Sequence, residues 1–216
     1  MVPEAPRFDS SGAAHDPAME EILPGLVHWT AMRETIHQPV HSAYVCEART
    51  LIDPMVPPEG LGPFHGDLPT PERIVLTNRH HNRHSARFVE AFGCSVHASR
   101  PGMHEFTSGE PVEPFGFGDT LPGGVAAYEA GAICPDDTAL HIPAHSALSV
   151  VDGVINYGGL GFVPEEHLGD DKDATKRAIR DSYARLLELD FDNVLVAHGE
   201  PIVGGGKDAL REFAEG

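Results

Sequence analysis

The chain lacks the features of a membrane protein, a disulfide scaffold or a nucleic-acid-binding protein. No apolar run in its 216 residues approaches the roughly 20 residues that a transmembrane helix needs. Its three cysteines are odd in number and far apart in sequence, which indicates reduced thiols rather than a disulfide framework. Only 15 lysines and arginines stand against 33 aspartates and glutamates, and the net charge of −18 disfavours nucleic acid and anionic membrane as partners.

The start of the chain also lacks the basic and apolar stretches of a secretory signal, so we expect a cytoplasmic protein. Residues 1–20 are polar and rich in turn-forming residues, which predicts a poorly ordered N-terminal arm. We expect residues 21–216 to form a single domain, large enough to bury a core without disulfides. No pattern in the sequence indicates an oligomeric state.

The chain is rich in glycine, proline and histidine, with 23, 19 and 14 residues respectively. The first two predict many turns and a β-rich architecture. Apolar alternation predicts three early strands, a hairpin near Ala48 and a long irregular loop over residues 53–71. A strand at 73–77, a helix that ends at Gly93 and a strand at 94–98 follow, which is the order of a parallel βαβ unit.

The second half of the chain predicts a meander of short strands and then a long helix. Asp152-Gly153 reads as a hairpin turn between strands at 148–150 and 154–157. The long amphipathic helix is expected over 173–189. A buried strand at 194–197 and a short helix from Lys207 complete the chain.

Three polar segments stand where predicted strands end. The densest, Thr77 to Ser85, contains three histidines and two arginines, and Cys134 to Thr138 contains two carboxylates. His198-Gly199 follows the strand at 194–197. Open α/β folds place ligands at the carboxyl ends of their strands, so these segments are the candidate site.

In order and spacing, these segments resemble the metallo-β-lactamase superfamily, from about Gly25 to the C-terminus. The family's first strands end in an aspartate, which matches Asp53, and its last histidine lies in a His-Gly turn, which matches His198. Its signature Thr-His-x-His-x-Asp-His starts at Thr77 and places His80 on the second histidine. The resemblance implies an α/β fold, an αβ/βα four-layer sandwich of the metallo-β-lactamase type, derived from a metal-dependent hydrolase.

The same alignment replaces several of the family's metal ligands. Asn78, Asn82 and Arg83 stand where the family has histidine, aspartate and histidine, and the bridging aspartate falls on the glycine pair 158–159. Arginine cannot ligate a metal, asparagine is a poor ligand and glycine has no side chain. We therefore do not expect the dinuclear zinc site of the family.

The remaining candidates for metal ligands are His80, His198 and Asp137, two histidines and one carboxylate that suit a single zinc, iron or manganese ion. His84 or His81 could take the place of the lost histidine if the start of the helix shifts. Asp137 enters this set because the family's Gly-His-Thr turn falls on residues 136–138. The catalytic candidates are His80 or His84 as a base, with Arg83, together with Arg79, recruiting a small and anionic substrate.

Simpler structural roles stand beside these. His80, His81 and His84 can cap and solvate the start of a helix, and Asp137 can be a turn residue. Arg83 can turn outward into solvent, pair with an acidic residue such as Asp53 or Asp137, or bind an anion. Two functions remain open: a divergent hydrolase with at most one metal and an unknown substrate, and a non-catalytic small-molecule or anion-binding protein that retains the cleft.

Overall fold

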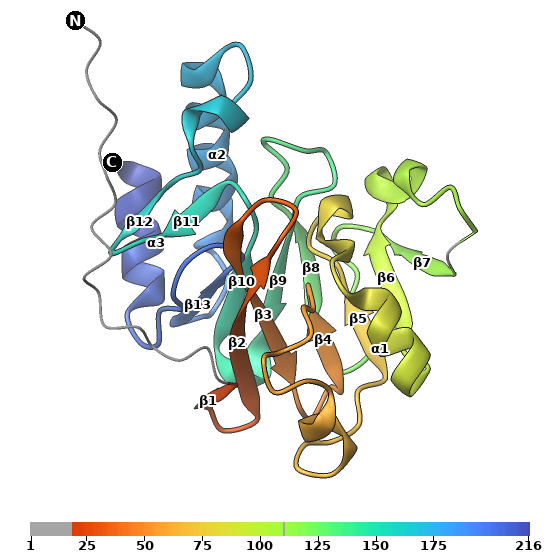
Figure 1. Cartoon of the computed structure of the whole chain (residues 1–216). Helices are drawn as coiled ribbons and strands as arrows, with labels where there is room; N and C mark the ends of the chain where they lie inside the picture. The colour runs from red at the N-terminus through yellow and green to blue at the C-terminus, as the bar shows by residue number, and fades with distance from the viewer. Residues whose placement is uncertain (1–18, 110) are drawn as a thin grey trace, which may run out of the picture.

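The computed structural model describes residues 19–109 and 111–216 (Figure 1). The predicted arm, residues 1–20, lies outside the described residues except at its end, where the first strand already begins at Glu20. A seven-stranded sheet has the order β1-β2-β3-β4-β5-β6-β7, antiparallel from β1 to β4 and parallel from β4 to β7. Its strands are β1 (Glu20–Leu23), β2 (Leu26–Arg33), β3 (Gln38–Val45), β4 (Thr50–Ile52), β5 (Arg73–Val75), β6 (Ser95–Ser99) and β7 (Val112–Phe115).

A second, four-stranded sheet has the order β13-β10-β9-β8, and a separate two-stranded sheet pairs β11 with β12. The strands are β8 (Ala126–Glu129), β9 (Thr138–Ile142), β10 (Ala147–Val150), β11 (Val154–Asn156), β12 (Leu160–Phe162) and β13 (Asn193–Val196). The α-helices are α1 (Ser85–Phe92), α2 (Lys172–Leu186) and α3 (Gly206–Glu215), and short 3₁₀ turns occur at η1 (Gly62–His65), η2 (Arg79–Asn82), η3 (Arg100–Glu105), η4 (Pro143–His145) and η5 (Glu165–His167).

Three apolar clusters join these elements into four layers (Figure 1). Phe88 of α1 packs on the outer face of the large sheet, against Leu51 and Ile74. A second cluster fills the space between the two sheets, and a third packs α2 and α3 on the far face of the small sheet. Alternation along β2 explains the division, because Leu26 faces the small sheet while Trp29 faces α1. The predicted αβ/βα four-layer sandwich is therefore confirmed.

The predicted βαβ unit is present, since β5 and β6 pair in parallel and α1 lies between them in sequence. Gly93 ends α1 with a left-handed backbone, at φ 71°, as its position after the apolar stripe predicted. The irregular loop over residues 53–71 covers the large sheet and buries Phe64 against Trp29 and Tyr44. In the described residues, no helix is both long enough and apolar enough to cross a membrane.

The predicted hairpin at Asp152-Gly153 is wrong. Strand β10 pairs with β9 and β13, while β11 leaves the sheet to pair with β12. Strand β10 runs parallel to β13, and Val150 pairs with Val196. The two strands therefore end at the same edge of the small sheet, and the chain after Val150 leaves the sheet there. Asp152 therefore lies beside the end of β13, which is the place of the candidate site.

Two histidines are buried between the sheets. His28 on β2 and His41 on β3 are 7% and 5% exposed, and His28 Nε2 lies 2.9 Å from His41 Nδ1. Burial lowers the pKa of His28 to about 4. Burial, with the nearby charges of His28, His198 and Arg83, lowers the pKa of His41 to about 3. The pair is therefore neutral at pH 7.

This neutral pair predicts an acid-sensitive fold. Because the folded pKa values of His28 and His41 lie below the unfolded value of 6.5, their contribution to stability is present above pH 6.5 and is lost as the pH falls toward 4. Between pH 7 and pH 5 the loss should be on the order of 3 kcal/mol. In urea unfolding at pH 7 and pH 5, His41→Gln should lose less stability than the unchanged protein. The exposed control His167→Gln should not differ from it, and an identical loss in all three would refute the assignment.

Candidate metal centre

The turn after β5 points one histidine inward and its neighbour outward. Asn78 caps η2 by accepting a hydrogen bond from the His80 backbone N–H at 2.8 Å. In this turn His81 is 2% exposed, whereas His80 is exposed. The histidine that enters the site is therefore His81.

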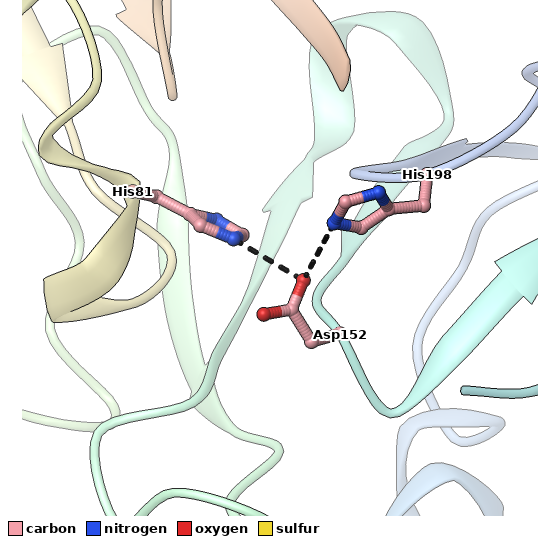
Figure 2. Close-up of side chains that lie close together, drawn as sticks. All are labelled: His81, Asp152 and His198. Atoms are coloured by element: carbon pink, nitrogen blue, oxygen red, sulfur yellow. Dashed lines mark ion pairs between the residues drawn. The ribbon is translucent and has the colours of Figure 1, made fainter. Parts of the chain in front are cut away.

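His81, Asp152 and His198 form a compact group at the ends of three segments that are far apart in sequence (Figure 2). Asp152 Oδ1 lies 3.2 Å from His81 Nε2 and 3.4 Å from His198 Nε2. One ligand atom from each residue lies within 4.8 Å of the others. The buried Oδ1 atom makes no hydrogen bond within the described part of the chain, although two ring nitrogens face it.

A third charged group holds His81 from the opposite side. Asp53 follows β4 and is 3% exposed. Its Oδ2 lies 2.8 Å from His81 Nδ1, and its Oδ1 accepts the Thr77 backbone N–H at 2.8 Å. The Thr77 hydroxyl also donates to Oδ2. Asp53 thus fixes the ring of His81 and leaves Nε2 directed at Asp152.

The charges of this group shift the pKa of each member. Burial by itself lowers the pKa of His81, but the attraction of Asp152 and Asp53 outweighs it and raises the pKa to about 9. Burial raises the pKa of Asp152, and the two histidines reverse this and hold it well below its usual range. The pKa of Asp53 is lowered in the same way: burial opposes the shift, and His81 and Arg83 cause it. The side chains of the site by themselves therefore form an ion cluster with a protonated His81.

The turn after β13 brings His198 to this group. Gly199 has φ 104°, and a Cβ there would lie 1.9 Å from the backbone oxygen of Asn156. Only glycine therefore allows this turn to pass so close to β11. The approach places His198, which is 16% exposed, beside Asp152.

Several solved structures share this architecture. The metallo-β-lactamase FIM-1 from Pseudomonas aeruginosa, in its mono-zinc form, has a TM-score of 0.66 and 14% identity, covering 92% of this chain and 95% of that one. A metallo-β-lactamase family protein from Thermus thermophilus has a TM-score of 0.62 and 15% identity, covering 89% of this chain and 79% of that one. The chain has the metallo-β-lactamase fold.

The fold also occurs in a larger protein. Rubredoxin oxygen:oxidoreductase from Desulfovibrio gigas has a TM-score of 0.65 and 16% identity over 92% of this chain, but the chain spans only 61% of that protein. No protein-family model and no curated protein sequence matches the chain. The likeness is therefore one of fold.

Within this metallo-β-lactamase fold, the predicted ligand set is only partly brought together. His198 belongs to the three-residue group, while His80 and Asp137 lie outside it. Asp137 is 1% exposed and accepts hydrogen bonds from Asn78 Nδ2 at 2.5 Å and from the Cys134 N–H at 2.9 Å. Burial raises its pKa to about 6. Asn78 and Asp137 thus satisfy each other's hydrogen-bonding groups. This agrees with the turn role that the sequence left open for Asp137.

The other predicted site residues have structural partners. Arg79 donates to Asp136 through its side chain and through its backbone N–H at 2.7 Å, so its charge is already paired. His84 Nδ1 accepts the Val56 N–H at 3.0 Å and ties the long loop to the start of α1. Burial and the neighbouring Arg79 lower the pKa of the exposed His80.

Arg83 turns inward rather than into solvent. Its Nη1 donates to the backbone oxygens of His41 at 2.5 Å and of Asp53 at 2.8 Å. Nε and Nη2 are buried and have no hydrogen-bond partner in the described residues. Of the alternatives left open, the solvated one does not hold, and Arg83 contacts Asp53 through its carbonyl rather than through its carboxylate.

The sequence placed His80 at the ligand position, with His81 only as an alternative, and it did not identify Asp152. The ungapped alignment placed the bridging aspartate on Gly158-Gly159, whereas the structure places the carboxylate of Asp152 between the two histidines. A signal existed, because Asp152 follows a short and largely apolar strand as Asp53 does. Read as a hairpin turn, Asp152 appeared to need no partner.

The close approach at Gly199 predicts a large effect of a single methyl group. Gly199→Ala should lower the melting temperature and the free energy of unfolding by several kcal/mol, because strain and a backbone clash add. Gly205→Ala is the matched control: it has φ 74° but no atom within 4 Å of the added Cβ. In this variant only the strain of the left-handed backbone should lower the free energy of unfolding, by about 1–2 kcal/mol. Equal losses in thermal and urea unfolding would contradict the close contact.

Proposed function

We propose that this protein is a metal-dependent hydrolase that binds one ion through His81, Asp152 and His198. The observation that supports the proposal is the buried Asp152 Oδ1, which makes no hydrogen bond among the described residues and faces two imidazole nitrogens. A buried carboxylate oxygen that faces two ring nitrogens at 3.2 and 3.4 Å without a well-formed hydrogen bond is costly, and a cation held by all three groups would offset that cost.

The chemistry of the donor set fits such an ion. Two imidazoles and a carboxylate suit zinc, iron or manganese. Metal-binding histidines commonly donate their second ring N–H to a carboxylate, and Asp53 lies 2.8 Å from His81 Nδ1 in that position. A bound ion would supply Lewis acidity toward a substrate oxygen.

The chain's own residues would orient the substrate and move protons. Asp53 holds the proton of His81 on Nδ1, which keeps Nε2 available for the ion. His80 is exposed beside the buried histidine, and its lowered pKa keeps the imidazole neutral at pH 7, as a proton acceptor requires. We assign it the role of general base. His84 is less suited to a catalytic role because its Nδ1 already accepts the Val56 N–H.

The usual dinuclear zinc site is largely lost in this proposal, which makes the protein a divergent member of its fold group. Asn78 and Asp137 bond to each other at 2.5 Å and not to the three-residue group. Arg83 brings a fixed positive charge close enough to lower the pKa of Asp53. A second cation would be repelled by that charge.

The balance of charge favours a small anionic substrate. With His81 neutral, a divalent ion and Arg83 contribute three positive charges, and Asp53 and Asp152 contribute two negative ones. The site then keeps a net positive charge in a protein of net charge −18. Such a local field concentrates anions at the site. Because Arg79 is paired with Asp136, Arg83 and the ion would carry this attraction.

A second candidate function is non-catalytic binding of an anion or another small molecule. The ion cluster of Asp53, His81 and Asp152 supports it, since a protonated His81 compensates both carboxylates without metal. In that case the cleft would hold a ligand with no reaction.

Metal binding separates the two functions. The purified protein should take up one equivalent of cobalt(II) or zinc, and Asp152→Asn should weaken that affinity at least ten-fold, because a charged ligand is lost. Hydrolysis in a screen of ester, thioester and phosphoester substrates should need the metal and be lost in this variant. Asp137→Asn is the control and should retain the affinity, since Asp137 lies outside the group. A metal-free protein with a tightly held small molecule would instead support the binding function.

A second test concerns the single-ion stoichiometry. Arg83→His should allow a second equivalent of cobalt(II) to bind, because the repelling charge is replaced by an imidazole that can ligate. It should also lower the free energy of unfolding by about 1–3 kcal/mol, since the carbonyls of His41 and Asp53 lose their donor. Arg87→His, at an exposed position of α1, is the control and should change neither quantity. One equivalent in both variants at saturating cobalt would show that Arg83 does not limit the stoichiometry.

A further inference from the structure

Asn156 joins the end of β11 to the turn that carries His198. Its backbone N–H donates to the His198 carbonyl at 3.0 Å, and its carbonyl accepts the Glu200 N–H at 3.2 Å. Its side-chain Nδ2 donates to the Glu200 carbonyl at 2.7 Å, and Oδ1 accepts the Gly159 N–H at 2.9 Å. Asn156 is only 9% exposed, so these bonds lie in an environment where losing a partner is costly.

These contacts hold the backbone on both sides of the His198 side chain. The His198 carbonyl and the Glu200 backbone are bound by one residue of β11. On the preceding side, the His41 N–H of β3 donates to the Ala197 carbonyl at 3.0 Å. The turn therefore has little freedom, although it belongs to a loop. Precise ligand geometry needs a rigid backbone of this kind.

We infer that Asn156 is a positioning residue, which sets the backbone of His198 so that its Nε2 faces Asp152. The amide side chain suits this task because it donates to the His198 turn and accepts from the β11–β12 turn at once. It thereby links the two-stranded sheet to the candidate metal centre. The consequence for metal affinity rests on the proposed function, whereas the orientation of His198 does not.

The chain contains a matched control at the start of β13, the strand that leads to His198. Asn193, in β13, is 8% exposed and also crosslinks two turns. Its Nδ2 donates to the His145 carbonyl at 2.9 Å, and its Oδ1 accepts the Gly204 N–H at 2.9 Å. Asn156→Ala and Asn193→Ala thus each remove side-chain hydrogen bonds to backbone groups from an asparagine that is buried to a similar extent. Asn156 lies beside the His198 turn, and Asn193 lies at the far end of β13.

The test compares these variants in the full chain by NMR of the metal-free protein. The Cε1–H signal of His198, assigned by its loss in His198→Gln, should shift or broaden in Asn156→Ala and stay in place in Asn193→Ala. Both variants should lower the melting temperature. Asn156→Asp, which keeps the acceptor for Gly159 but loses the donor to Glu200, is the second variant if the alanine variant does not fold. An unmoved His198 signal in the folded variants, or an equal shift in Asn193→Ala, would overturn the inference.

Cobalt(II) titration of the same proteins gives the second measurement. Asn156→Ala should weaken cobalt binding about ten-fold, the usual cost of losing a residue that orients a ligand, and Asn193→Ala should leave it unchanged. If the His198 signal shifts but the affinity does not, the positioning of His198 has no bearing on the metal and that part of the inference is wrong. If the unchanged protein binds no cobalt, the proposed function fails, while the NMR comparison still decides the role of Asn156.

Discussion

The buried carboxylate of Asp53 is the constraint on which the site depends. A charge that is 3% exposed must be compensated, and it is compensated by the Thr77 backbone N–H, the Thr77 hydroxyl and the His81 ring. These bonds join the ends of β4 and β5 to the turn that follows β5. One interaction therefore orders the adjoining strand ends and sets the direction of His81.

The charges that surround this carboxylate compensate one another. Asp152 compensates His81 from the other side, and Arg83 is held by two carbonyl groups rather than by a carboxylate. A buried guanidinium with unpaired nitrogens persists only because Asp53 and Asp152 lie nearby and attract it. In the single-ion site that we propose, the positive charge of Arg83 would oppose a second cation.

The amino-acid sequence determined the elements and the layers. Short continuous apolar runs identified β5 and β13, and alternation of apolar residues identified β9. Gly93 marked the end of α1 after its apolar stripe. The resemblance to the metallo-β-lactamase superfamily indicated the four-layer sandwich. It also located His198 in a glycine turn, since few residues other than glycine tolerate that backbone.

Only the tertiary structure decided which polar side chains meet. His80 and His81 are neighbours in sequence, and the cap that Asn78 places on η2 turns one outward and the other inward. Asp152 reads as a hairpin turn until β10 is seen to pair in parallel with β13, which directs the following loop to the end of that strand. Asp137 and Asn78 are 59 positions apart and compensate each other. Such contacts depend on the pairing of strands that are far apart in sequence, and a local periodic pattern does not predict them.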